Sequence, residues 1–259
     1  MAQAATAVIN KPSWVELTTS DSEGARAFYS RIFGWQIEVN PDPQYGGYAI
    51  AKLGADDAAG IGPRQSPDAP TAWGLYIGTD QIDELARRVP EEGGTVIVQP
   101  FDVGDQGRMT VVTDPIGAVI SMWQGVRMSE FAAYRQNAFG WAELNARRLE
   151  RAIPFYEEIF GWSHTTNEAS EGVPAYTQFQ RDGEQLAGAF EMSQDVPAGV
   201  SSFWMIYFNV EDVDATAQAI AQAGGAVTVG PDDYFGGRFA IVSDPQGATF
   251  GLFKSADAG

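Results

Sequence analysis

Apolar positions along this chain switch between a period of two residues and a period close to four. Apolar and polar side chains alternate in WVELTT at 14–19, as in a strand that has one buried face. The next segment is predicted to be a helix, because its apolar residues fall on one helical face: Ala25, Phe28, Tyr29, Ile32 and Phe33. Ser20 and Glu23 resemble a capping box at its start, and Gly34 is placed to end it in a left-handed conformation.

The same pattern occurs twice in nearly the same letters. FYSRIFGW at 28–35 returns as FYEEIFGW at 155–162. Other matched pairs follow in unchanged order: Trp14/Trp141, Tyr48/Tyr176, Trp73/Trp204, Tyr76/Tyr207, Gly93/Gly224 and Asp114/Asp244. This repeat predicts two homologous domains, 1–127 and 128–259, with no Pro/Gly/Ser-rich linker between them.

Each half divides again into two similar units. After a Pro-rich loop at 63–70, a strand at 73–77 leads into a second amphipathic helix, and three more strands follow. The unit is therefore a strand, a helix and three strands, and it is present four times. We predict an α+β fold of four βαβββ units with mixed β-sheets.

The composition of the chain limits the classes of partner that it can bind. The net charge of −18 disfavours binding to nucleic acid and to anionic membranes, and no basic patch offsets it. The chain has no cysteine, which excludes disulfides, thiolate catalysis and sulfur-ligated metal centres. No cationic leader with an apolar run and no stretch of about 18 apolar residues occurs. We expect a cytoplasmic protein, monomeric or homodimeric, whose partner is a small organic ligand.

Paired βαβββ units, an FYxxxFGW helix end and a DPxG turn before the last strand resemble the vicinal oxygen chelate superfamily. That superfamily includes glyoxalase I, bleomycin resistance proteins and extradiol dioxygenases. The resemblance covers essentially the whole chain and is nearest to two-domain glyoxalase-like proteins that are labelled hydroxylases. It implies that each half curls its sheet into a cup, with helices outside and a ligand cavity inside.

The resemblance also implies where a divalent cation would be bound. The superfamily's metalloenzymes use His, Gln or Glu on the first strand of a unit and Glu on the last strand, after DPxG. In this chain the corresponding positions are Trp14 and Trp141, Gly74 and Met205, and Ser121 and Gly251. None of these side chains suits a hard or borderline cation. We therefore predict no metal and no cofactor.

Strand alternation predicts which side chains line the two cups. For the first cup they are Trp14, Glu16, Thr18, Tyr76, Val119, Ser121 and Trp123. For the second they are Trp141, Glu143, Asn145, Met205, Tyr207, Asn209, Thr249 and Phe253. The cups are thus expected to be aromatic, with one acid apiece.

Glu16 and Glu143 are the candidate catalytic residues. A carboxylate on an aromatic-walled concave sheet can transfer protons or hold a ligand's amine or hydroxyl group. The alternatives are a pairing with arginine or water at a domain interface, and a relocated metal site that would lack imidazole ligands. A structural role is the alternative for the aromatic lining residues as well.

Other polar and aromatic residues are interpreted as structural. His164, the single histidine, is expected on the surface, and Arg108 and Arg238 are expected in ion pairs rather than at an anionic ligand. The tryptophans outside the predicted cups are expected in the core: Trp35, Trp73, Trp162 and Trp204.

Three functions stay open from the sequence. The first is a metal-independent protein that binds a small, partly aromatic molecule, as in antibiotic resistance by sequestration. The second is a glyoxalase-like enzyme, a hydroxylase, isomerase or lyase of secondary metabolism, with Glu16 or Glu143 as the general acid or base. The third is a non-catalytic scaffold whose cups are filled by its own side chains.

Overall fold

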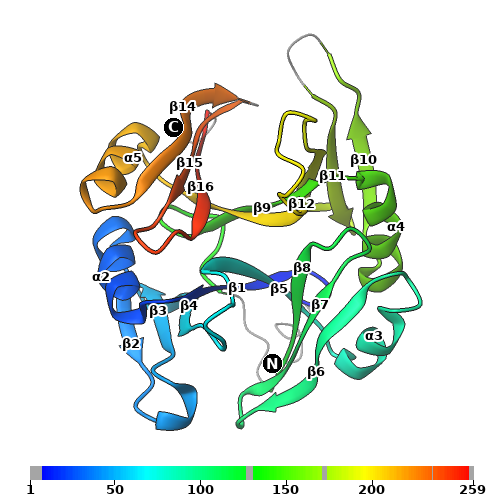
Figure 1. Cartoon of the computed structure of the whole chain (residues 1–259), viewed down its shortest axis with the longest axis horizontal. Coiled ribbons are helices and arrows are strands. Elements are labelled where there is room, and N and C mark those ends of the chain that lie inside the picture. The colour runs from blue at the N-terminus through cyan, green and yellow to red at the C-terminus, as the bar shows by residue number, and fades with distance from the viewer. Residues whose placement is uncertain (1–7, 127–130, 171–173, 235, 257–259) are drawn as a thin grey trace. The chain divides into compact units, whose positions relative to one another are not determined.

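The computed structural model describes residues 8–126, 131–170, 174–234 and 236–256 (Figure 1). Its helices are α2 Ser22–Phe33, α3 Ile82–Arg88, α4 Leu149–Phe160 and α5 Val213–Gln222, with a 3-10 turn at Pro43–Tyr45. The strands of the first half are β1 Pro12–Thr19, β2 Gln36–Val39, β3 Ala49–Leu53, β4 Asp56–Pro63, β5 Ala72–Gly78, β6 Thr95–Val103, β7 Gly107–Thr113 and β8 Val119–Gly125. Those of the second half are β9 Phe139–Ala146, β10 Ser163–Asn167, β11 Tyr176–Arg181, β12 Glu184–Glu191, β13 Phe203–Asn209, β14 Ala226–Tyr234, β15 Gly237–Ser243 and β16 Thr249–Ser255.

The strands form two eight-stranded mixed sheets of the same order. They are β2-β3-β4-β1-β5-β8-β7-β6 and β10-β11-β12-β9-β13-β16-β15-β14. In each βαβββ unit the first strand pairs in parallel with the last strand, as β1 does with β4 and β5 with β8, while the remaining pairs are antiparallel. The predicted α+β fold of four βαβββ units is confirmed.

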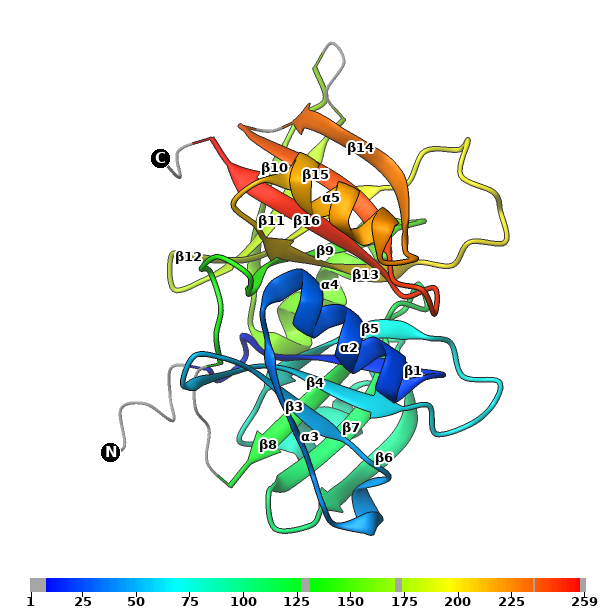
Figure 2. The same ribbon diagram turned by 90° about the vertical axis from the view of Figure 1, so that its left-hand side faces the viewer.

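Each helix covers the strands of its own unit. Helix α3 packs on β6, β7 and β8, and α5 packs on β14, β15 and β16, as Figure 2 shows for α5. Helix α2 packs on β4, and α4 packs on β12. In each sheet, these helices therefore cover one face and leave the opposite face uncovered by helices.

Contacts divide the chain into two compact units, each with segments from both halves. The first unit comprises the described residues within 1–13, 75–130 and 142–204, and the second those within 14–74, 131–141 and 205–259. The domain boundary at 127 stays a prediction, because residues 127–130 lie outside the described part of the chain.

Capping residues define both ends of α2, and the N-terminal cap differs from the predicted one. The N-cap of α2 is Asp21, whose side chain accepts a hydrogen bond from the backbone N–H of Gly24. The capping box predicted at Ser20 is therefore wrong by one residue, because Asp21 supplies the better-placed acceptor. Gly34 and Gly161 end α2 and α4 at φ of 70° and 64°, which confirms the predicted left-handed caps.

Two buried hydrogen-bond networks account for the most distinctive repeated letters. In one, the indole N–H of Trp73 donates to the Tyr29 hydroxyl at 3.0 Å, and that hydroxyl donates to Asp244. The Oδ1 of Asp244 accepts backbone N–H bonds from Gln246 and Ala248 and so closes the DPxG turn. The second network repeats this arrangement with Trp204, Tyr156 and Asp114. These residues are therefore core components of the fold.

Candidate ligand-binding site

The inner face of β1 carries a carboxylate that is held by a tyrosine. Val15 and Leu17 are fully buried, whereas Trp14, Glu16 and Thr18 alternate with them and stay partly exposed. The hydroxyl of Tyr48 donates to the Oε2 of Glu16 at 2.8 Å. Alternation along β1 was therefore predicted correctly.

The hydroxyl group of Tyr48 has a defined hydrogen-bond direction. The indole N–H of Trp14 approaches the Tyr48 oxygen at 3.4 Å, and an indole nitrogen is only a donor. The Tyr48 proton is consequently directed to the Oε2 of Glu16, which accepts it. The hydrogen bonds from Trp14 to Tyr48 and from Tyr48 to Glu16 thus orient the Glu16 carboxylate on the sheet.

Two glycines of β4 make room for the Tyr48 ring. Gly60 lies opposite Glu16 in the parallel register, and a Cβ added to Gly60 would lie 2.1 Å from the Tyr48 hydroxyl oxygen. A Cβ on Gly62 would lie 2.9 Å from the ring. Any larger residue at position 60 would displace the tyrosine, so the sequence of β4 fixes the place of Tyr48.

The second half repeats the acid–tyrosine pair. The hydroxyl of Tyr176 donates to the Oε2 of Glu143 at 2.9 Å, and Gly188 of β12 lies opposite Glu143. The amide of Asn145 donates to the backbone oxygen of Glu143 at 3.3 Å. The pair is therefore present in both compact units, in the first as Glu143 with Tyr176 and in the second as Glu16 with Tyr48.

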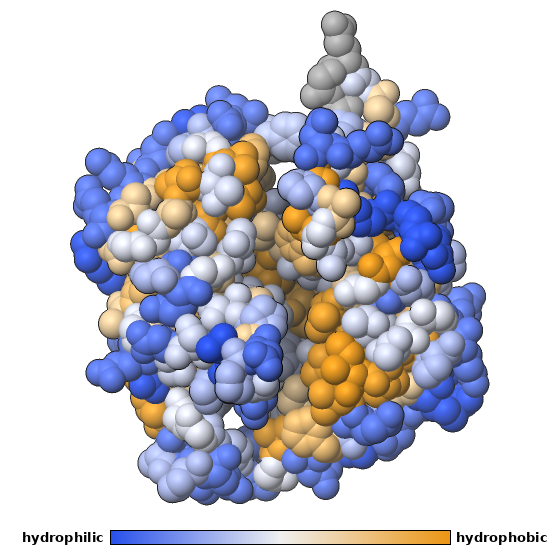
Figure 3. All heavy atoms as spheres, viewed as in Figure 1, coloured by the Kyte–Doolittle hydropathy of each residue, from blue (hydrophilic) through white to orange (hydrophobic). Residues whose placement is uncertain are grey.

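Strands β5–β8 of the first compact unit expose an apolar inner face. Ser121 lies opposite Tyr76 and Val111, and Trp123 lies opposite Met109. On β6, the side chains on the same face are Val98, opposite Val111, and Phe101, opposite Met109. Val98, Phe101 and Val119 are 38%, 44% and 49% exposed, and Figure 3 shows apolar side chains gathered over β6, β7 and β8. None of these eight described residues carries a charge, so the face suits an apolar or aromatic surface.

Strands β13–β16 of the second compact unit carry an aromatic counterpart. The ring of Tyr207 lies directly over Gly251, where an added Cβ would come within 2.0 Å of it. The ring of Phe253 lies over Gly237, and the Asn209 amide lies against Gly140. Met205, predicted to face the cup, is only 6% exposed.

The residues at the family's cation positions do not fit a metal ion. At the last-strand position of β16, the Tyr207 ring occupies the space that a side chain on residue 251 would need. Trp14 and Trp141 offer no ligand atom of the kind that divalent cations bind in proteins. Within the described ranges, no group of three or more His, Asp or Glu residues is arranged to hold an ion.

The remaining polar candidates lie outside these faces. His164 pairs with Glu157 of α4 at 2.7 Å, as a residue on the helix side. Arg108 is paired with Asp83 and Asp102, and Arg238 with Asp214 and Asp233. The expectation that these three residues are structural or on the surface is thus confirmed.

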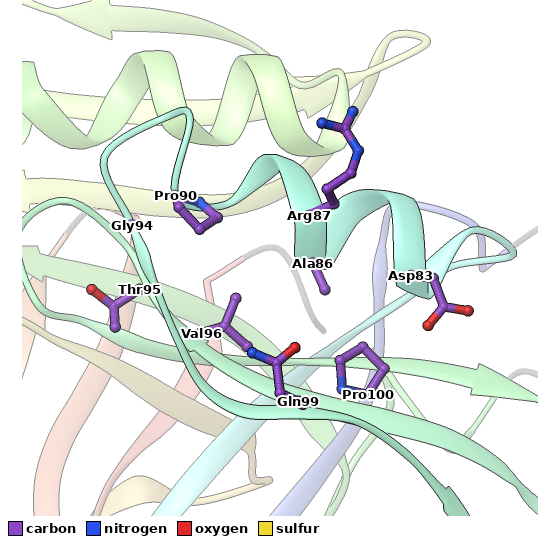
Figure 4. A pocket seen from close by; sticks show the side chains of 9 residues that line it. All are labelled: Asp83, Ala86, Arg87, Pro90, Gly94, Thr95, Val96, Gln99 and Pro100. Carbon is purple, nitrogen blue, oxygen red and sulfur yellow. The ribbon is translucent and has the colours of Figure 1, made fainter.

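An open groove of about 570 Å³ lies between α3 and β6 (Figure 4). Ala86, Pro90, Val96 and Pro100 contribute apolar lining, and Arg87 is paired with Glu84 and Glu91. The groove contains none of the predicted site residues.

The predicted site residues fall into both compact units. Tyr76, Ser121, Trp123, Glu143 and Asn145 belong to the first, and Trp14, Glu16, Thr18, Trp141, Met205, Tyr207, Asn209 and Phe253 to the second. The sequence interpretation missed Tyr48 and Tyr176 as partners of the acids. Their recurrence at matched positions of the repeat was the signal that could have found them.

A family model, described as Glyoxalase/Bleomycin resistance protein/Dioxygenase superfamily, matches residues 11–122 and again 138–252. The chain belongs to this superfamily. Members of the superfamily bind small-molecule substrates. No helix in the described part of the chain combines the length and apolarity needed to cross a membrane.

Two relatives match over nearly their full length. The chain is 39% identical over 254 residues to "Putative glyoxylase CFP32" of Mycobacterium tuberculosis, covering 95% of each protein. It is 31% identical over 260 residues to "Anthracycline biosynthesis protein DnrV" of Streptomyces peucetius, covering 94% of this chain and 92% of that protein.

Solved structures support the fold. The Mn(II)-bound glyoxalase from Novosphingobium aromaticivorans aligns with a TM-score of 0.66 at 13% identity, covering 96% of this chain and 82% of that one. The 2,3-dioxygenase LapB from Pseudomonas sp. KL28 aligns with a TM-score of 0.64 at 14% identity, covering 94% and 91%. At these identities the similarity concerns the fold alone.

Proposed function

We propose that this protein binds a small, partly aromatic organic molecule on the inner faces of its sheets without a metal ion. The observation that carries the proposal is the replacement of cation ligands by rings, above all Tyr207 packed over Gly251. The uncharged sheet surface formed by Tyr76, Met109, Trp123 and the residues next to them favours flat apolar ligands. Such binding would serve sequestration of the ligand or its handling in a biosynthetic route.

The relatives support an organic ligand of this kind. One relative of comparable length is named for the biosynthesis of anthracyclines, which are a class of organic natural products. The high acidity of the chain, with a net charge of −18, favours neutral or cationic ligands over anions.

The test is a thermal-shift screen of aromatic natural products, run on protein before and after treatment with EDTA, together with elemental analysis of protein purified without chelators. We expect stabilisation by at least one planar compound that is unchanged by EDTA, and substoichiometric metal. A tightly held transition metal at one ion per half, or stabilisation lost on chelation, would contradict the proposal.

A second candidate function is proton-transfer catalysis, and the tyrosine–glutamate pairs favour it. A carboxylate oriented by a hydrogen bond is suited to act as a general base, since its acceptor atom is fixed in space. Under this alternative Glu16 or Glu143 would act on a ligand proton in a hydroxylase-, isomerase- or lyase-type reaction.

Mass spectrometry of each bound compound after incubation separates the two functions. If the protein is an enzyme, Glu16→Gln or Glu143→Gln abolishes a mass or isomer change that the wild type produces. If it is a binder, the compound is recovered unchanged and both variants only weaken its retention. Glu23→Gln on α2 and Glu150→Gln on α4 are the matched controls, because both carboxylates are exposed on helices.

A further inference from the structure

Each compact unit has a core to which both halves of the chain contribute. In the second unit, Tyr29 and Phe33 of α2 belong to the first half, and Phe208 and Phe250 belong to the second half. The ring centroids of Phe33 and Phe208 are 5.0 Å apart, and those of Tyr29 and Phe250 are 5.7 Å apart. The second half therefore packs two rings against the helix of the first half.

The repeat places smaller residues at the matched positions of the first compact unit. Counting along the repeat, Ile77 of β5 is the match of Phe208. In the same way, Ile120 of β8 is the match of Phe250. Both isoleucines are buried, at 0% and 1% exposure, in the compact unit that contains α4. The first half thus contributes smaller side chains to this core than the second half contributes to the other.

A ring of the second half itself compensates for this difference. Phe179 of β11 is fully buried, and its ring centroid lies 5.3 Å from that of Tyr156 and 5.4 Å from that of Trp162. The match of Phe179 in β3 is Ala51, which is also fully buried. The half with its own large residue therefore receives small ones, and the half with its own small residue receives large ones.

The hydrogen bonds between the halves do not share this asymmetry. The indole N–H of Trp35, in the first half, donates to the backbone oxygen of Asn137 at 2.7 Å. The indole N–H of the matched Trp162 donates to the backbone oxygen of Asn10 at 2.6 Å. Because each half has both the donor and the acceptor, such bonds can equally join two copies of one half. They hold two halves together without determining which halves pair.

We propose that the large and small core residues select the partner of each half, so that the surface fits the opposite half and rejects a second copy of the same half. Two first halves would bring two isoleucines against a core that has Ala51, which leaves a cavity. Two second halves would bring two phenylalanines against a core already filled by Phe179, which overpacks it. The partner that this surface takes is the complementary half.

The stability test reproduces both kinds of core within the full chain. Phe179→Ala/Phe208→Ile/Phe250→Ile gives the second half the pattern of the first half, so both units resemble a pairing of two first halves. Ala51→Phe/Phe208→Ile/Phe250→Ile makes the same two Phe→Ile changes but supplies a ring at position 51, which is the pattern of the first unit. We expect the first variant to have a Tm lower than that of the second by about 5 °C or more.

The components of the second variant are its controls. Ala51→Phe alone adds a ring to a filled core, and Phe208→Ile/Phe250→Ile alone leaves a cavity, so each should have a lower Tm than the combination. Thermal unfolding followed by circular dichroism gives these values. If the combination is no more stable than Phe208→Ile/Phe250→Ile, a ring at position 51 does not replace the rings of the second half, and the inference is overturned.

The choice of partner is measured by the mass of the refolded protein. In Ala51→Phe/Phe208→Ile/Phe250→Ile both halves carry the same pattern, so each half fits its copy in a second chain. We expect refolding from urea at high protein concentration to give a larger fraction of discrete dimers than the wild type gives, measured by size-exclusion chromatography with light scattering. Tyr29→Phe weakens the same core but keeps the asymmetry, and it should refold like the wild type. Equal dimer fractions in the triple variant and the wild type would overturn the selection of partners.

Discussion

Tyr29 and Asp244 are 215 positions apart in the sequence, and the hydroxyl of the first donates to the Oδ2 of the second at 3.0 Å. The matched pair, Tyr156 and Asp114, makes the same bond at 2.9 Å. The FYxxxFGW helix of each half is thus hydrogen-bonded to the DPxG turn of the other half. This exchange explains why the letters FY and DPxG recur together.

Removing the Tyr29 hydroxyl should destabilise the fold. Tyr29→Phe leaves the buried Asp244 with one fewer donor and the Trp73 N–H without its acceptor. We expect a loss of about 1–3 kcal/mol in the free energy of unfolding, the usual cost of an unsatisfied buried group. Urea denaturation measures it, with Tyr134→Phe at a half-exposed site as the control. Equal stability of the two variants would contradict the structural role.

The stability contributed by Asp244 should decrease as the pH rises. Burial raises the pKa of Asp244 above its ordinary value, although backbone N–H groups and the Tyr29 hydroxyl lower it. The folded state therefore binds the proton more tightly than the unfolded state. That stability is fully present below the unfolded pKa of about 3.9 and is lost as the pH rises through the folded pKa.

The measurement is the difference in unfolding free energy between the wild type and Asp244→Asn, taken from pH 4 upward by urea denaturation. We expect the wild type's advantage to shrink with rising pH and then to level off. Asp105→Asn, at an exposed turn, is the matched control for the substitution itself. If the wild type's advantage in unfolding free energy instead grows with pH, burial is not the dominant influence on the pKa of Asp244.

Restoring the family's glutamate should not restore a metal site. In Gly251→Glu the new Cβ would fall 2.0 Å from the Tyr207 ring, so the ring or the strand must shift. We expect a loss of about 1–3 kcal/mol from overpacking, and no greater rise of Tm with added Mn²⁺ than in the wild type. Differential scanning fluorimetry with and without the ion checks both. Specific stabilisation by Mn²⁺ would show that the donor set is more complete than the described residues indicate.

The sequence predicted most of this architecture because its signals are local or repeated. Alternation in WVELTT identified Val15 and Leu17 as buried and Glu16 as facing the other side, and Trp73 and Trp204 are core residues as expected. The glycines after FYxxxF marked both helix ends. These features depend on nearest neighbours along one strand or one turn of helix.

The sequence could not identify the partners of these residues, because partners are set by pairing between distant segments. Tyr48 reaches Glu16 only because β4 places Gly60 beside it, and no spacing along the chain encodes that register. Likewise, the aromatic residues Trp73 and Tyr29 were each expected in the core, but their link to Asp244 was not. The assignment of Glu16 and Glu143 as catalytic stays a prediction.

The space that Gly60 and Gly62 of β4 leave for the Tyr48 ring can be tested without any ligand. Gly60→Ala adds a Cβ that would lie 2.1 Å from the Tyr48 oxygen and 3.1 Å from the Trp14 indole nitrogen. We expect a loss of about 1–3 kcal/mol in the free energy of unfolding. Gly199→Ala, where a Cβ would meet no atom within 4 Å, should be close to neutral.

A double-mutant cycle shows whether Tyr48 is the residue that collides. In the Tyr48→Ala background the ring is absent, so Gly60→Ala should cost much less than in the wild type, and the two changes should be non-additive. Urea denaturation of the four proteins gives the coupling. If Gly60→Ala costs the same in both backgrounds, the glycine is needed for a reason other than Tyr48, and the ring is not held by β4. A coupling concentrated on this pair would instead establish that β4 fixes the tyrosine, and through the tyrosine the acceptor oxygen of Glu16.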